Sequence, residues 1–157
     1  MPRTLGTQLR HLIELLDGAV ERAYTDIGLD YRPRYTPVMR ILMRQGPATV
    51  GEIAEAAAIT QPAVTQTVGR MVEAGLVSIE PGSRDARQRI VQLTPKGQAL
   101  VPELERCWRA TAMAAQSLDR DLEHPLGEIL EATIRALEGH SFDERIRAAR
   151  HTLERGD

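Results

Sequence analysis

The 157-residue sequence contains a single cysteine, Cys107. One cysteine excludes an intramolecular disulfide and a zinc site built from several cysteines. The four histidines, His11, His124, His140 and His151, do not have the spacing of metal ligands either. We therefore expect neither a metal nor another cofactor.

Aromatic residues are also scarce, at 3% of the chain. Five rings do not furnish the stacking platforms with which some sheets bind single-stranded nucleic acids. The sequence contains no run of 18 apolar residues, so no membrane span is expected. The N-terminus lacks the apolar core and cleavage site of a secretion signal. These absences predict a cytoplasmic protein. No Ser-His-Asp, Walker or dinucleotide motif is present, so no enzyme is expected.

The net charge of −2 argues at face value against a nucleic-acid-binding protein. The charge is unevenly distributed, however. Residues 31–100 contain nine basic and five acidic side chains, a local charge of +4. Residues 1–30 contain three basic and five acidic side chains (−2), and residues 101–157 contain eight and twelve (−4). A local excess of Lys and Arg indicates which part of a chain contacts phosphate, so the middle segment is the candidate.

Apolar periodicity and end signals predict a mainly helical fold with one β-hairpin. A long helix is expected over 4–28, and Thr36-Pro37 begins a second one that ends at Gly46-Pro47. Strands are expected over 76–79 and 89–93. Thr94-Pro95 begins a further helix, a shorter one follows over about 126–138, and the Ser141–Glu144 capping-box spacing begins the last.

Two short helices lie between these segments, the first beginning at the Thr49–Glu52 capping-box spacing and the second at Thr60. Because a turn of three or four residues separates these two helices, the pattern predicts a helix-turn-helix. In the second helix the inward-facing residues are expected to be Val64, Val68, Met71 and Val72.

The opposite face of this second helix is polar, and no acidic residue occurs between Glu55 and Glu73. A carboxylate beside phosphate would weaken DNA binding, whereas Gln and Thr can contact base edges in the major groove. Arg70 suits a phosphate. The same pattern also fits a polar, solvent-facing helix of any small helical domain. The candidate DNA-binding residues of the helix are Thr60, Gln61, Pro62, Thr65, Gln66 and Arg70.

Arginines are concentrated at the tip of the predicted hairpin, where Arg84, Arg87 and Arg89 surround Asp85. Such a loop is often only a solvated turn. Directly after a helix-turn-helix, however, the hairpin could lie beside the DNA groove as a wing. An arginine on a narrow turn can enter the minor groove, and Asp85 could hold a neighbouring arginine through a bidentate pair. We therefore add Arg84, Asp85 and Arg87 to the candidate DNA-binding residues.

From about Tyr35 to Leu100 the sequence resembles the MarR (multiple-antibiotic-resistance regulator) family of winged helix-turn-helix transcription factors. The motifs that carry the resemblance are Thr49-Val-Gly-Glu-Ile-Ala, Thr60-Gln-Pro-Ala-Val-Thr-Gln, Met71-Val-Glu-Ala-Gly-Leu-Val, Arg84-Asp-Ala-Arg and Val91-Gln-Leu-Thr-Pro-Lys-Gly. The family wing usually has an aspartate two residues before the first arginine, where this sequence has Gly82.

The resemblance implies a homodimer that binds pseudo-palindromic double-stranded DNA, commonly as a repressor released by a small ligand. It places an effector pocket between the first two helices and the wing, where the candidate lining residues are His11, Tyr35, Met39, Arg40 and Met43. These residues could equally be ordinary core and surface. Some relatives sense oxidants through a cysteine in the first helix, which here has none, so we interpret Cys107 as an inert thiol.

Together these observations predict a mainly α fold with a small β-hairpin wing. Residues 31–100 would form the winged helix-turn-helix DNA-binding domain, and residues 1–30 and 101–157 the helical dimerisation region. The predicted function is that of a bacterial transcription regulator. The alternative is a winged helix that binds another protein and has no specific affinity for DNA.

Overall fold

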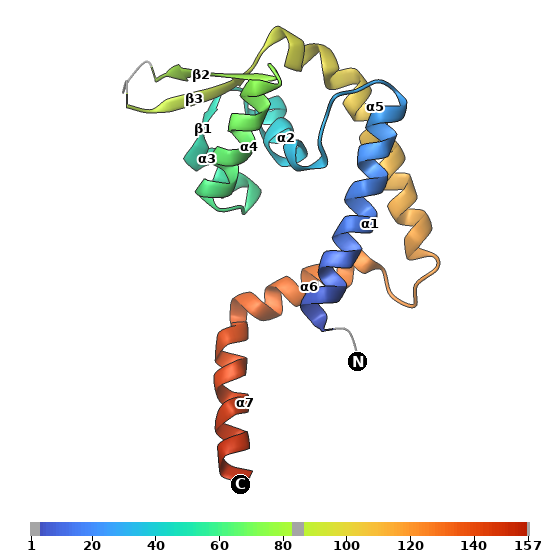
Figure 1. Ribbon diagram of the computed structural model, residues 1–157, viewed down its shortest axis with the longest axis vertical. Coiled ribbons are helices and arrows are strands. Elements are labelled where there is room, and N and C mark those ends of the chain that lie inside the picture. The colour runs from blue at the N-terminus through green and yellow to red at the C-terminus, as the bar shows by residue number, and fades with distance from the viewer. Residues whose placement is uncertain (1–3, 83–86, 157) are drawn as a thin grey trace. The chain divides into compact units, whose positions relative to one another are not determined.

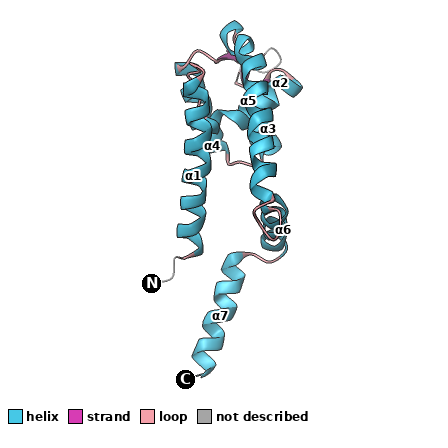
Figure 2. Cartoon of the chain, turned by 90° about the vertical axis from the view of Figure 1, so that its right-hand side faces the viewer, coloured by secondary structure: helices cyan, strands magenta, loops and turns pink. Residues whose placement is uncertain are grey.

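The structure, a computed structural model, describes residues 4–82 and 87–156. It is mainly helical with a small antiparallel sheet, which confirms the predicted fold class (Figures 1 and 2). The chain divides into two compact units, Met1–Arg109 and Ala110–Asp157, and the boundary falls within a long helix.

The first unit begins with helix α1 (Leu5–Asp26), followed by a 3-10 turn (Pro33–Tyr35) and helix α2 (Thr36–Gln45). The hydroxyl of Thr4 accepts a hydrogen bond from the Thr7 N–H at 3.3 Å and so caps the N-terminus of α1. Pro37 lies in the first turn of α2, where its missing N–H costs no hydrogen bond.

The helix-turn-helix consists of α3 (Val50–Ala57) and α4 (Gln61–Glu73). The predicted capping box is present: the Thr49 hydroxyl accepts from the Glu52 N–H, and the Glu52 carboxylate accepts from the Thr49 N–H. These hydrogen bonds hold the pKa of Glu52 below its usual value. Ala58 turns the chain between the two helices with a left-handed backbone, φ 53°.

The sheet has the strand order β1-β3-β2, with β1 at Ala48–Thr49, β2 at Val77–Pro81 and β3 at Arg89–Leu93 (Figure 1). Strands β2 and β3 form the predicted hairpin. The sequence did not predict β1, because two residues show no periodicity and this strand exists only through its pairing with β3.

Helix α5 (Pro95–Asp119) completes the core of the first unit through Leu104, which is fully buried, and through Leu100, Cys107 and Trp108, which pack against the core. The core also draws on α1, α2, α3, α4 and the sheet. Its buried members are Tyr24, Tyr31, Tyr35, Val38, Met39, Ile41, Leu42, Ala48, Ile53, Ala54, Val64, Val68, Met71, Leu76, Val77, Val91 and Leu104.

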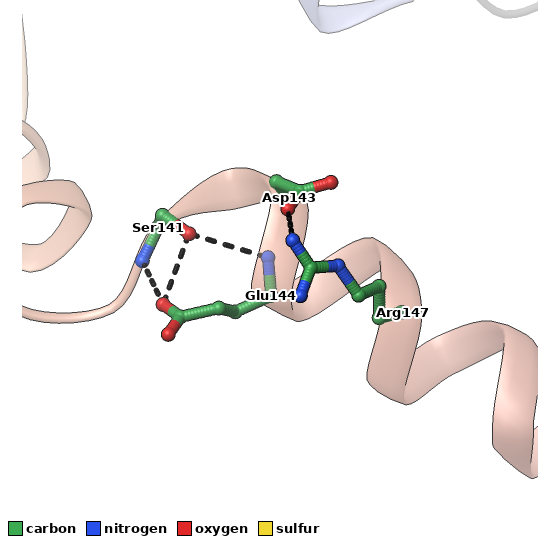
Figure 3. Close-up of polar contacts among 4 residues, drawn as sticks. All are labelled: Ser141, Asp143, Glu144 and Arg147. Carbon is green, nitrogen blue, oxygen red and sulfur yellow. Dashed lines mark hydrogen bonds and ion pairs between the residues drawn. The ribbon is translucent and has the colours of Figure 1, made fainter.

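The second unit contains the end of α5, helix α6 (Leu126–Gly139) and helix α7 (Phe142–Gly156). The Asp119 carboxylate accepts from the Leu126 N–H at 3.0 Å and so satisfies a donor at the start of α6. The predicted second capping box is present at Ser141 and Glu144 (Figure 3). No residue described in this unit is buried.

Candidate nucleic-acid interface

Helix α4 separates its apolar and polar side chains onto opposite faces. Val64, Val68 and Met71 are at most 1% exposed, and they fix the helix to the core of the first unit. Val72 was also expected to face inward, but this prediction is wrong, because 40% of its surface is exposed. The predicted DNA-binding residues of α4 are all exposed: Thr60, Gln61, Pro62, Thr65, Gln66 and Arg70.

Local hydrogen bonds order the polar groups at the start of α4. Thr60 is the N-cap, and its hydroxyl accepts from the Ala63 N–H at 3.4 Å. The Thr65 hydroxyl donates to the Gln61 carbonyl at 2.9 Å. Its oxygen retains acceptor capacity for a group outside the protein. Thr60 is therefore a helix cap, whereas Thr65 and Gln66 lie exposed on the next turn of α4.

Arg70 is the one basic residue of α4, and it lies in the last turn. Its guanidinium is 3.2 Å from the Glu73 carboxylate, which the sequence analysis did not anticipate. Both side chains are exposed, so this ion pair is weak and a phosphate can replace the carboxylate at small cost.

The wing is described only in part. Arg84 and Asp85, two of the three predicted wing residues, lie outside the described residues. Arg87 is exposed in the turn before β3, and Arg89 is exposed on β3 opposite Pro81. The Gly82 N–H donates to the Gln88 carbonyl at 2.8 Å, so the hairpin closes with Arg87 inside its loop.

Three residues at the start of α5, none of them among the predicted site residues, hold the C-terminal end of α4. The Lys96 ammonium donates to the Ala74 carbonyl at 2.7 Å, and the Thr94 hydroxyl donates to the Gly75 carbonyl at 2.6 Å. A positive charge at a helix C-terminus is favourable. Gly97 packs so closely that a Cβ atom there would lie 2.2 Å from the Leu76 carbonyl oxygen.

This junction explains in physical terms why the motif that begins at Val91 has threonine at position 94 and glycine at position 97. Gly75 follows the end of α4 with φ 71°, a left-handed conformation that favours glycine, and turns the chain into β2. Thr94 and Gly97 then lock that turn against α5. The pattern was visible in the sequence, but its role depends on contacts between residues about twenty positions apart.

The predicted effector residues occupy two environments. Tyr35 and Met39 are buried in the core, Met43 packs against it, and the guanidinium of Arg40 lies 4.6 Å from the ring centroid of Trp108. His11 is exposed on α1, with its Nδ1 3.9 Å from the Glu14 carboxylate. The structure therefore places four of the five residues on consecutive turns that run from the 3-10 turn along α2.

Aromatic side chains connect this region to α1 and α5. The Trp108 indole N–H donates to the Tyr24 hydroxyl at 3.1 Å. Tyr24, Tyr31 and Tyr35 pack edge to face in sequence, with ring centroids 5.0 and 5.6 Å apart. Burial raises the pKa of Tyr31 well above its usual value. The cluster ties α1, α2 and α5 together within the first unit.

Other kinds of site find no support in the described part of the chain. Its histidines, cysteine and carboxylates form no cluster of three that could hold a metal ion. Within the same residues, no helix is long and apolar enough to cross a bilayer. Burial raises the pKa of the Cys107 thiol, which disfavours the reactive thiolate.

Residues 28–88, which contain the helix-turn-helix and most of the hairpin, match the family model of the MarR family. Over these residues the chain is similar to the MarR family. An uncharacterized HTH-type transcriptional regulator of Staphylococcus aureus is 33% identical over 63 residues, which are 40% of the present chain and 43% of that protein. The match thus spans less than half the length of this curated relative.

Solved structures share the fold at lower identity. A mutant MarR from E. coli complexed with operator DNA superposes with a TM-score of 0.64 and 21% identity, covering 85% of this chain and 92% of that one. BpsR of Bordetella bronchiseptica, whose DNA binding is regulated by 6-hydroxynicotinic acid, gives a TM-score of 0.60 and 23% identity, covering 88% and 98%. The region that is similar to the MarR family therefore lies within a fold shared over most of the chain.

Proposed function

We propose that this protein is a sequence-specific, double-stranded-DNA-binding transcription regulator that acts as a homodimer on a pseudo-palindromic operator. The observation that carries the proposal is the exposed face of α4. From Gln61 to Arg70 this face is polar and has no carboxylate, while its opposite face is anchored in the core. An exposed polar helix on a rigid base suits the major groove.

Each candidate residue has a distinct proposed role. Thr65 and Gln66 contact base edges, and Gln61 and Pro62 approach the groove from the start of the helix. Thr60 positions this end by capping it. Arg70 binds a phosphate in exchange for its contact with Glu73.

In the wing, Arg84 and Arg87 reach the flanking minor groove, and Asp85 orients one of them. This assignment rests on the sequence pattern and on the exposed position of Arg87 in the hairpin loop. Lys96 differs from these residues, because its ammonium is engaged with the end of α4. We assign it to positioning the helix rather than to binding phosphate.

We assign dimerisation to residues 1–30 and 101–157. Support comes from the apolar side chains of α1, which recur at helical spacing and yet remain exposed in the single chain. A stripe of this kind is a candidate for burial against a second copy. The exposed members are Leu5, Leu9, Ile13 and Leu16.

We further propose that the regulator is a cytoplasmic repressor whose release depends on a small molecule bound near His11, Tyr35, Met39, Arg40 and Met43. The regulation of BpsR by 6-hydroxynicotinic acid supports this class of mechanism. Because Tyr35 and Met39 are already buried, a ligand here would act by repacking α2 against Trp108. Displacement of Arg40 from the indole ring is the change that Trp108 fluorescence would report.

The proposal is tested with DNA fragments that the protein itself selects from genomic DNA. Gln66→Ala should reduce the preference for the selected sequence over unrelated DNA about tenfold, since one good base contact is worth 1–3 kcal/mol. Arg70→Ala should weaken binding to both DNAs and lower the slope of log affinity against log salt by about 0.9 per lost phosphate contact. Gln45→Ala, which changes an exposed glutamine at the end of α2, is the matched control.

The same titration distinguishes the alternative function, a module that binds another protein. If affinity for every DNA is weak and unaffected by these substitutions, the DNA-binding proposal fails. An apolar protein interface would also change little with salt, in contrast to binding that releases counterions from phosphate.

A further inference from the structure

Helix α7 carries a narrow apolar stripe with the spacing of a coiled-coil seam. Its members are separated by four, three and four residues, the heptad order d-a-d-a. The three large side chains are 57%, 42% and 72% exposed, in chain order. The stripe consists of Phe142, Ile146, Ala149 and Leu153.

The helix has structural reasons to adopt this register by itself. Its N-terminus is closed by the capping box, in which the Ser141 N–H donates to the Glu144 carboxylate at 2.7 Å (Figure 3). Arg145 donates from Nε to the His140 carbonyl at 3.1 Å and from Nη2 to the Ala136 carbonyl at 3.3 Å, which ties α7 to the end of α6. A 15-residue helix without packed neighbours is nevertheless only marginally stable in water.

Charged residues flank the stripe asymmetrically. At 100° per residue, Asp143 and Arg150 lie on one side of it, at the two e positions of the heptads. Arg145 and Thr152 lie on the other side, at the g positions. Asp143 also pairs with Arg147 along the helix (Figure 3). The e side thus has opposite charges seven residues apart, on either side of the centre of the stripe.

We infer that α7 pairs in antiparallel orientation with α7 of a second copy of this chain. In that arrangement Phe142 lies opposite Leu153 of the second copy, and Ile146 lies opposite the small Ala149. Asp143 then faces Arg150 of the second copy, and two-fold symmetry produces this ion pair twice. The g positions bring Arg145 opposite the neutral Thr152.

The charges also discriminate against the parallel arrangement and against other partners. In a parallel pair, the g residue Arg145 would face the e residue Arg150 of the other helix, and two like charges would meet on each side. A membrane surface selects helices rich in Lys and Arg on their polar face, whereas α7 mixes both signs. The stripe is therefore self-complementary in one orientation.

Charge reversal tests the pairing through the dimer dissociation constant, measured by sedimentation of the full chain. Asp143→Arg and Arg150→Asp should each raise this constant about five- to tenfold, because two attractive pairs become repulsive. The double variant should return to within about twofold of the wild type. Arg147→Gln, which removes only the pair along the helix, should leave the constant unchanged. A double variant no better than either single variant would overturn the proposal.

Disulfide trapping tests the orientation. In a Cys107→Ser background, Phe142→Cys combined with Leu153→Cys should form a covalent dimer under mild oxidation, with the peptide of one site joined to the peptide of the other. Neither substitution alone should form it, because each would then lie about 16 Å from its counterpart. A covalent dimer from Phe142→Cys alone would indicate a parallel pair, and its absence from the double variant would indicate another occupant of the stripe. Both results contradict the inference.

The α7 pairing rests on the homodimer of the proposed function, but neither experiment contains DNA. Loss of the α7 pairing and failure of the DNA-binding proposal are therefore observed separately.

Discussion

Every buried apolar residue of the described chain lies between Tyr24 and Leu104, whereas α6 and α7 carry apolar side chains that remain exposed. The two regions do not differ in having amphipathic helices, because α4 and α6 both have a well-defined apolar face. They differ in what covers that face. Helix α4 packs with α2, α3 and β2 in its own unit, whereas α7 is joined to α6 by the hydrogen bonds of Arg145.

Residues 24–104 therefore form a packed core, while α6, α7 and the start of α1 leave apolar side chains uncovered. This division agrees with the charge distribution, in which the +4 segment of residues 31–100 lies entirely in the first unit. A DNA-binding surface needs a rigid base, which the core under α4 provides. An association surface needs exposed apolar area, which α6 and α7 provide.

The largest expected effect comes from removing a leucine of the core. Leu104→Ala should lower the free energy of unfolding by about 3–4 kcal/mol, because it leaves a cavity in a fully buried site. Leu137→Ala, in the half-exposed face of α6, should cost less than about 1 kcal/mol in dilute protein. Denaturant titration at low and high protein concentration measures both. Only the α6 variant should become more costly at high concentration, where association contributes.

Two glycines provide the next comparison. Gly97→Ala should destabilise the first unit by about 2–3 kcal/mol, because its Cβ would meet the Leu76 carbonyl oxygen at 2.2 Å. A Cβ atom added at Gly127 in α6 would meet no atom within 4 Å. Gly127→Ala should therefore be neutral or stabilise the protein by up to about 1 kcal/mol. Thermal unfolding of both variants gives the answer, and equal losses would contradict the packing described for Gly97.

A smaller effect is expected at the aromatic cluster. Tyr24→Phe removes the acceptor of the Trp108 indole N–H and should lower the free energy of unfolding by about 1 kcal/mol. Because Trp108 is the only tryptophan, its emission reports the change directly. Tyr31→Phe, whose hydroxyl is 3.5 Å from that of Thr36, serves as the control and should leave the emission unchanged.

The smallest effect concerns the two capping boxes, one in each unit. The backbone hydrogen bond of Ser141 lowers the pKa of Glu144 below its ordinary value of 4.5, as that of Thr49 does for Glu52. A carboxylate whose pKa is lower in the folded state than in the unfolded state stabilises the fold at any pH above its unfolded-state pKa. This stabilisation is lost as the pH falls through the pKa of the folded state. Helix content should therefore decrease in acid below about pH 4.5.

Glu144→Gln should make the helix content less sensitive to pH in this range, and Glu154→Gln near the other end of α7 should not. Circular dichroism between neutral pH and about pH 3 separates the two variants. Identical acid transitions in the wild type and Glu144→Gln would show that this cap does not contribute.

Much of the fold could be predicted because its signals are local. Helix ends at Thr49, Thr60 and Ser141 follow from side chains that cap the backbone within three residues. Strand β1 could not be predicted, since it exists only through β3. The prediction that Val72 faces the core was wrong because helical periodicity gives only the direction of a side chain around the helix axis. Whether that side chain is buried depends on which other elements cover that side of the helix.

The candidate interface could be predicted in part for the same reason. The exposure of Thr65, Gln66 and Arg70 follows from helical periodicity within α4. The contact of Arg70 with Glu73 is local, but Glu73 lies just outside the stretch without acidic residues that defined the candidate face. The support that Thr94, Lys96 and Gly97 give to the end of α4 depends on tertiary contacts, which spacing alone does not reveal.

We propose that a rigid α4 binds DNA in each of two copies of the chain, which associate through surfaces outside the core. The most direct test is to align genomic fragments selected by the wild-type protein. We expect two inverted copies of one short motif with centres about 10 base pairs or a multiple apart, and loss of that motif among fragments selected by Gln66→Ala. A single unpaired motif, or an unchanged motif with the variant, would contradict it.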